Sequence, residues 1–187
     1  PEFNLRGAMA VAPGGYQYEG IAKYAASHPQ IEKSVIAFLP IVLLGAEAAE
    51  PSLDIMNLLS PEMGEIVNRA RNRGLSELQA SVQEAPKTVF KPDANLNPLI
   101  DYSKKQSIEN MIPTVPVMII QGDKDQIVDP HGTYAYYQQI CKMGKPIAFQ
   151  PVEGADHHGS LSQSEFMVAD FINSIEHKQF KSTCGKE

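Results

Sequence analysis

Two short polar segments contain the side chains that could do chemistry. Residues 122–130 read GDKDQIVDP, and residues 154–160 read GADHHGS, which sets His157 and His158 side by side among small residues. A carboxylate that accepts a hydrogen bond from an imidazole fixes the tautomer of the ring and stabilises its protonated form. The other ring nitrogen can then act as a general base. The two segments therefore predict an acid–histidine pair, the proton-handling half of a nucleophilic hydrolase.

Each of these segments follows a stretch that is typical of a buried strand. Residues 115–121, VPVMIIQ, are almost continuously apolar, and residues 146–152 form a second strand after a helix predicted over 133–143. A nearly continuous apolar run suits a parallel strand that is covered on both faces. Functional groups gather at the carboxyl ends of the strands in open parallel sheets. Neighbouring strands would therefore bring the two polar segments together at one rim.

The remaining elements alternate between strand and helix. We expect strands at Ala8–Ala12 and Ile31–Leu39, a helix over Glu19–His28 between them, and a final helix over Ser164–Ile175. The inner face of that final helix is expected to hold Val168, Phe171, Ile172 and Ile175. Alternating strands and helices predict an α/β fold with a mainly parallel sheet.

The middle of the chain differs, because residues 45–110 contain no convincing strand. Apolar residues there recur at helical spacing: Met63, Ile66, Val67 and Ala70, then Leu75, Leu78 and Val82. This pattern indicates a helical insertion. The expected organisation is a first core segment at 1–44, a helical cap at 45–112 and a second core segment at 113–187.

Composition excludes several classes of function. The chain has 187 residues, of which 43% are hydrophobic and 20% charged, and its net charge is −6. Lysine and arginine are neither in excess nor clustered, so we expect no nucleic-acid partner. The apolar run Val35–Leu44 is too short to span a bilayer and contains Pro40, so we expect no transmembrane segment.

Each polar segment also has a plainer interpretation. Aspartates after a strand commonly bond their own backbone in a turn. A histidine pair in a small-residue loop is often only a solvated turn. Zinc could in principle bind Asp123, Asp125, His157 and His158, but no helix carries a histidine pair four residues apart and the cysteines lie elsewhere. We therefore predict neither a metal nor an organic cofactor.

Taken together, the two segments resemble the C-terminal half of an α/β-hydrolase. PVMIIQGDKDQIVDP is similar to the strand and acid turn of that family, with its Gly-x-x-Asp-x-x-Val pattern at Gly122, Asp125 and Val128. FQPVEGADHHGS is similar to the last strand and histidine loop. The resemblance thus implies that Asp125 is the triad acid and His157 the triad histidine, with His158 as the fallback.

The tail of the chain narrows this resemblance to the secretory lipase family. Two cysteines alone leave free thiols and a disulfide equally open. YYQQICKMGKPIAFQPVEGADHHG, followed by a helix and a cysteine near the end, is similar to that family, so the resemblance implies a Cys141–Cys184 bridge. A disulfide implies an oxidising compartment, so the expected location is secreted or periplasmic. The helical insertion fits a lid over an acyl pocket.

The nucleophile that such a pair would activate is missing. In this fold a serine sits in Gly-x-Ser-x-Gly on a strained turn between strand and helix. Residues 14–20 read GGYQYEG, which puts Gln17 at the nucleophile position and Glu19 at the closing glycine, and no Gly-x-Ser-x-Gly occurs in the 187 residues. Three explanations stay open: a nucleophile outside these residues, a decayed elbow in a non-catalytic protein, or another serine such as Ser160.

The expected function is ester hydrolysis of the lipase or esterase type by Ser-His-Asp acyl transfer, acting on an ester or lipid substrate. The alternatives are a catalytically inactive binding protein of the same fold and a peptidase of the same superfamily. The strand at Ala8–Ala12 would have an open edge, which predicts self-association or a second chain that completes the sheet. The following cap residues are expected to form core rather than an acyl site: Leu53, Ile55, Met56, Leu58 and Leu59.

Overall fold

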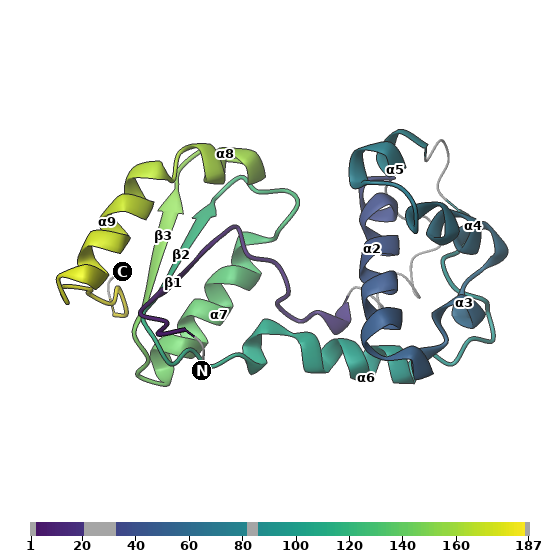
Figure 1. The fold of residues 1–187 in the computed structure, drawn as a ribbon, viewed down its shortest axis with the longest axis horizontal. Helices are drawn as coiled ribbons and strands as arrows, with labels where there is room; N and C mark the ends of the chain where they lie inside the picture. The colour runs from purple at the N-terminus through teal and green to yellow at the C-terminus, as the bar shows by residue number, and fades with distance from the viewer. Residues whose placement is uncertain (1–2, 21–32, 82–85, 186–187) are drawn as a thin grey trace. The chain divides into compact units, whose positions relative to one another are not determined.

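The computed structural model describes residues 3–20, 33–81 and 86–185. The chain forms two compact units, which are described separately (Figure 1). The sheet unit comprises residues 1–17 and 107–187, and the helical unit comprises residues 18–106. Residues 33–44, which the sequence analysis assigned to the first core segment, therefore lie in the helical unit.

Three parallel strands form the centre of the sheet unit (Figure 1). They are β1 at Ala8–Val11, β2 at Val117–Gly122 and β3 at Ile147–Val152, in the order β1-β2-β3. Val11 is in register with Ile120, and Ile120 is in register with Gln150. The predicted α/β class and these three strands are confirmed.

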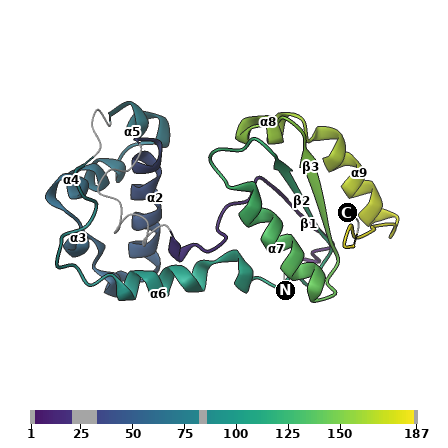
Figure 2. The same ribbon diagram turned by 180° about the vertical axis from the view of Figure 1, so that it is seen from behind.

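Helices cover both faces of this sheet (Figure 2). The connection from β2 to β3 contains α7, Pro130–Lys142, whose buried Tyr137 and Ile140 pack with Ile119 and Ile147. On the other face, Ile120 and Val152 are buried with Ala155, and Met167 of α9 packs against them. Successive residues of β2 thus enter opposite layers, which explains why its sequence is apolar at nearly every position.

The last helices, α8 at His157–Ser162 and α9 at Glu165–Glu176, follow β3. Phe171 is the buried residue of α9, whereas Ile172 is 50% exposed. The prediction that Ile172 lies on the inner face is therefore wrong. Helical spacing places Ile172 about 100° from Phe171, so both cannot face a narrow contact.

The tail of the chain is fastened to α7 and β3. Cys141 of α7 and Cys184 form a disulfide with a Cα–Cα distance of 5.5 Å, as the resemblance implied. The Thr183 hydroxyl accepts a hydrogen bond from the Phe149 amide at 2.9 Å and lies 3.0 Å from the Tyr137 hydroxyl. The disulfide and these hydrogen bonds hold the C-terminal segment against α7 and β3.

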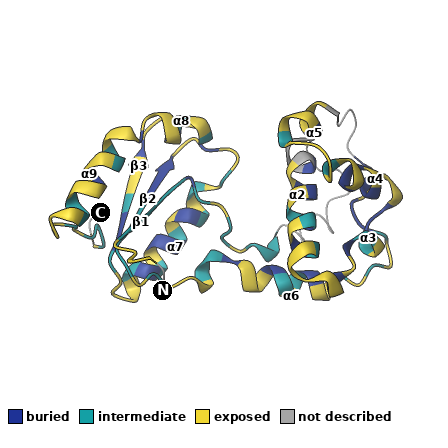
Figure 3. Cartoon of the chain, viewed as in Figure 1, coloured by how far each residue is buried: buried dark blue, intermediate teal, exposed yellow. Residues whose placement is uncertain are grey.

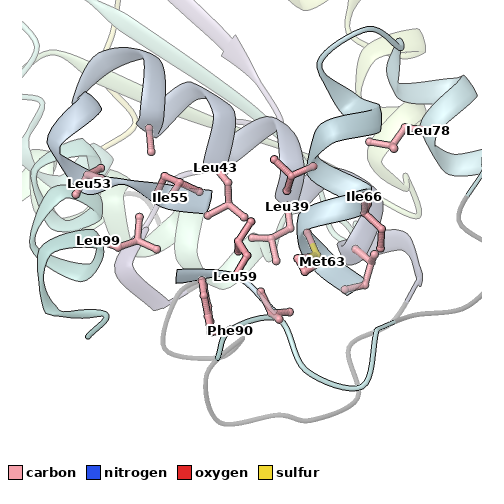
Figure 4. Packing of buried hydrophobic residues seen from close by; sticks show 14 residues of the cluster. Leu39, Leu43, Leu53, Ile55, Leu59, Met63, Ile66, Leu78, Phe90 and Leu99 are labelled. Carbon is pink, nitrogen blue, oxygen red and sulfur yellow. The ribbon is translucent and has the colours of Figure 1, made fainter. Parts of the chain in front are cut away.

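The helical unit is built around a single apolar core (Figure 4). Its described elements are α2 at Lys33–Ala49, a 3-10 turn η1 at Pro51–Leu53, α3 at Ile55–Leu58, α4 at Pro61–Ala70, α5 at Leu75–Ser81 and α6 at Asn97–Gln106. Leu43, Met63 and Phe90 meet in this core, and its residues form the buried side of each helix (Figure 3). Of the predicted core residues, Leu53, Ile55 and Leu59 are buried, and Met56 and Leu58 pack against them.

The strand expected at Ile31–Leu39 does not form, because residues 33–39 belong to α2. The residues of α2 described as buried are Ile36, Leu39, Pro40, Leu43 and Ala46, which recur at helical intervals of three and four. That spacing lines one side of a helix, whereas a half-buried strand would alternate. Residues 31–32, most of the predicted helix Glu19–His28 and the predicted core residue Val82 lie outside the described residues. No described helix is long and apolar enough to cross a membrane.

Candidate acid–histidine site

The acid turn after β2 anchors one oxygen of the Asp125 carboxylate. Its side chain has no exposed surface. The Oδ1 atom accepts hydrogen bonds from the backbone amides of Ile127 and Val128, each at 2.9 Å. This is the local turn bonding that an aspartate commonly makes. It occupies one carboxylate oxygen only, so the turn leaves Oδ2 available to another residue.

Gly122, the last residue of β2, permits the acid turn and the histidine segment to approach closely. A Cβ atom at this position would lie 2.6 Å from the Ser160 hydroxyl and closer still to the Ala155 carbonyl oxygen. The Gly122 amide donates to Ser160 Oγ at 2.9 Å. Only glycine leaves room for this backbone contact, which explains the glycine at the start of the Gly-x-x-Asp pattern.

His157 is brought to Asp125 by the first turn of α8. Asp156 caps this helix, because its carboxylate accepts a hydrogen bond from the Gly159 amide at 2.6 Å. The Nδ1 atom of His157 lies 2.9 Å from Asp125 Oδ2. The side chain of His157 is 30% exposed, whereas the Asp125 carboxylate is fully buried. The imidazole is therefore held at one nitrogen and remains partly accessible.

Hydrogen bonds keep the carboxyl group of Asp125 in its charged form. Burial by itself raises the pKa, because it disfavours the charge. The hydrogen bonds from the Val128 amide, His157, the Ile127 amide and Gln121 together outweigh burial, so the pKa of Asp125 lies below its ordinary value. The side chain is thus an anion at neutral pH, as a group that orients an imidazole must be.

The other polar residues of the two segments have structural roles. Asp123 accepts a hydrogen bond from the Gly154 amide at 2.7 Å, and Asp129 caps α7 by accepting one from the His131 amide at 3.0 Å. His158 is exposed, and its ring lies edge-on to that of His157. Throughout the described part of the chain, no three histidine, cysteine, aspartate or glutamate side chains are grouped to hold a metal ion.

Ser160 is fully buried and its hydroxyl group is already engaged. Its Oγ donates to the Asp156 carbonyl at 2.8 Å and accepts from the Gly122 amide at 2.9 Å. These bonds tie α8 to the end of β2. The serine therefore supports the approach of the two segments, and its proton is directed away from any imidazole.

The segment at residues 14–20 has one feature of a nucleophile elbow and lacks another. Gln17 has a φ angle of 48°, a left-handed conformation that is uncommon for a residue other than glycine. However, β1 ends six residues earlier, at Val11, whereas an elbow joins the strand directly to the helix. The Gln17 amide instead donates to the Glu109 carboxylate, with both oxygens at 3.2 Å.

Sequence reasoning missed one residue of the site, Gln121. It is fully buried, and its Nε2 donates to Asp125 Oδ2 at 2.9 Å. The sequence signal that could have identified Gln121 was its polar side chain at the end of the apolar run 115–121. A lone polar residue there has many possible explanations, and only the folded chain shows which atom it contacts.

Solved structures of a lipase and of a putative hydrolase are similar to this chain in fold. The chain is similar to the X-ray structure of Candida antarctica lipase A, with a TM-score of 0.79 and 19% identity over 100% of this chain and 45% of that one. A putative hydrolase from Legionella pneumophila gives a TM-score of 0.69 and 15% identity over 97% of this chain and 51% of that one. The chain thus spans about half the length of these structures. A search of curated proteins found no match.

At such low identity the structural likeness shows the fold alone, which is a partial α/β-hydrolase fold. A model of the secretory lipase family matches residues 76–173. This match includes both the acid turn and the histidine segment, and it covers more than half of the chain. The chain therefore belongs to the secretory lipase family.

Proposed function

We propose that this chain supplies the acid and the base of a serine-type ester hydrolase of the lipase class. The observation that carries the proposal is the 2.9 Å approach of His157 Nδ1 to the buried, ionised Asp125. Asp125 holds the imidazole in the tautomer with a proton on Nδ1. The free Nε2 of His157 is then the general base.

The reaction follows from these roles. His157 Nε2 removes the proton from a serine hydroxyl as its oxygen forms a bond to the acyl carbon of an ester. The bond to the alcohol then breaks, and the imidazolium returns the proton to the departing oxygen. Water repeats the sequence and releases the acid and the free serine. No redox or metal step is required by this chemistry.

The nucleophilic serine lies outside these 187 residues in this proposal. The chain contains no Gly-x-Ser-x-Gly, and the Ser160 hydroxyl is used structurally. Among the described strands β1 is at the edge of the sheet, paired only with β2. An open strand edge can pair with further backbone. Sequence upstream in the same polypeptide, or a second chain, would add the serine-bearing strand at this edge.

Family membership supports an ester or lipid substrate. The Cys141–Cys184 disulfide supports a secreted or periplasmic location, because such bonds persist in oxidising compartments. The second candidate is a catalytically inactive protein of the same fold. It is favoured by Gln17, which occupies a strained turn where a nucleophile was expected.

A fluorophosphonate probe, which modifies activated serines, tests where the nucleophile lies. We expect no labelling of the 187-residue chain alone. Labelling of a serine within the chain would overturn the proposal that the nucleophile lies outside these 187 residues, and it would also reject the catalytically inactive candidate. The coding sequence upstream of Pro1 is the second arm of the test. A Gly-x-Ser-x-Gly there, with p-nitrophenyl ester hydrolysis by the extended polypeptide, supports the proposal, and an extended polypeptide without either favours the inactive protein.

A further inference from the structure

We propose that Gln121 is a positioning residue that acts on His157 through Asp125; this inference rests on the hydrolase function proposed above. Gln121 is the penultimate residue of β2 and is completely buried. Its Nε2 atom lies 2.9 Å from Asp125 Oδ2, the oxygen that also lies 2.9 Å from His157 Nδ1. One carboxylate oxygen thus receives two donors, one of which comes from the sheet itself.

The amide of Gln121 supplies a constraint that the turn does not. The Ile127 and Val128 amides hold only Oδ1, so the carboxylate could still swing about that oxygen. Without Gln121, Oδ2 would be held solely by the imidazole that it is meant to orient. With Gln121, the direction of the second oxygen is set before the histidine binds to it.

The carbonyl oxygen of the Gln121 side chain, Oε1, indicates that this residue is poorly suited to a purely structural role. Its Oε1 atom is buried and has no hydrogen-bond partner among the described residues. An unfilled buried acceptor is destabilising. The preceding strand residues Ile119 and Ile120 are buried and apolar, so an apolar side chain would suit the surroundings of the strand better. The amide contributes a 2.9 Å hydrogen bond to Asp125 Oδ2 and a longer one, at 3.4 Å, to the Gly122 carbonyl.

The test is Gln121→Met in the 187-residue chain, which removes the amide and keeps the side-chain length. Nitrogen-15 NMR of the imidazole measures how neutral His157 divides between its Nδ1–H and Nε2–H tautomers. We expect the equilibrium to shift about tenfold away from Nδ1–H, the effect of one hydrogen bond to a charged group. We also expect the thermal midpoint to stay unchanged or rise, because the unfilled acceptor is removed.

Gln139→Met is the matched control. Gln139 lies on α7, and its Nε2 donates to the Glu109 carbonyl at 2.8 Å, away from the pair. This variant should leave the His157 tautomer unchanged and lower the thermal midpoint slightly. A Gln121→Met variant that behaves in the same way would assign Gln121 a structural role and overturn the inference.

Gln121→Glu provides a second readout should the methionine variant fail to fold. Two neighbouring carboxyl groups share a proton, so the introduced group has a raised pKa. While protonated it can donate to Asp125 Oδ2 as the amide does, and once ionised it repels that oxygen. The hydrogen-bonded Nδ1 proton of His157 should therefore be visible at low pH and be lost on ionisation, whereas the parent keeps it over the same range. A signal that persists in the variant would contradict the inference.

Asp125→Asn separates this inference from the function on which it rests. If that variant has the same His157 tautomer as the parent, the acid–histidine pair fails, and the proposed function fails with it. If Asp125→Asn changes the tautomer and Gln121→Met does not, only the role of Gln121 is rejected.

Discussion

Different forces stabilise two regions of the chain, the rim at the carboxyl ends of the strands in the sheet unit and the core of the helical unit. At the rim, Asp125 and Ser160 are buried polar groups, and their side-chain oxygens make directional hydrogen bonds. The helical core, around Leu43 and Met63, consists of apolar contacts without a required direction. Loss of one atom at the rim should therefore alter chemistry, whereas loss of atoms in the core should alter stability.

The largest expected effect is on the chemistry of the rim. In a polypeptide that includes the nucleophile, Asp125→Asn should lower kcat by about 10⁴-fold, because the imidazole loses the partner that selects its tautomer. Steady-state hydrolysis of a p-nitrophenyl ester measures the change. His158→Ala is the control and should retain activity, since His158 is exposed. Equal losses in the two variants would break the assignment of His157 as the base.

Backbone crowding at the rim gives the next largest effect. Gly122→Ala should destabilise the sheet unit by more than about 4 kcal/mol, because the new methyl group meets the Ala155 carbonyl and must displace backbone. Gly45→Ala is the matched control. Gly45 lies inside α2 with open space around it, so the variant should gain about 1 kcal/mol from helix propensity. Urea unfolding followed by circular dichroism compares the two, and a stable Gly122→Ala would contradict the close approach.

A cavity in the helical core should affect stability alone. Leu43 is 2% exposed, so Leu43→Ala should cost about 3 kcal/mol of unfolding free energy through lost burial and the space left behind. Ile41, on the same helix, is 48% exposed, and Ile41→Ala should change little. The His157 tautomer measured by NMR should match the parent in both variants. A changed tautomer in Leu43→Ala would show that the helical core also acts on the rim.

The smallest expected effect is on the acid dependence of stability. The pKa of Asp125 is lower in the folded chain than in the unfolded chain, so ionised Asp125 stabilises the fold above the unfolded value. This stabilisation is lost as the pH falls through the folded pKa. The difference in unfolding free energy between the parent and Asp125→Asn should therefore narrow as the pH drops below about 4. Urea unfolding at several pH values tests this, and a constant difference would refute it.

Asp129→Asn is the control variant for the measurements of unfolding free energy at several pH values. Hydrogen bonds from His131 lower the pKa of Asp129 as well, but its side chain is 71% exposed. Solvent screening weakens such a contribution. Asp129→Asn should therefore follow the parent closely across the pH range.

Much of the sheet unit could be predicted from the sequence because its signals are local. The apolar runs of β2 and β3 marked buried parallel strands, and the polar segments that follow them marked the rim. The pairing of Asp125 with His157 followed from strand adjacency and from the family pattern. The helical unit was predicted less well: an apolar segment rich in β-branched residues suggested a strand at Ile31–Leu39, and α2 formed there instead. Such runs fit a buried helix and a buried strand alike.

The sequence by itself determined the strands of the sheet, the two polar segments and the residue types that can move a proton. Those features depend on side chains that are near one another along the chain. Only the tertiary structure decided that α2 is a helix, that Ser160 is engaged structurally and that Gln121 contacts Asp125. Each of these outcomes depends on a partner brought close by folding, and a pattern of neighbouring residues contains no information about that partner.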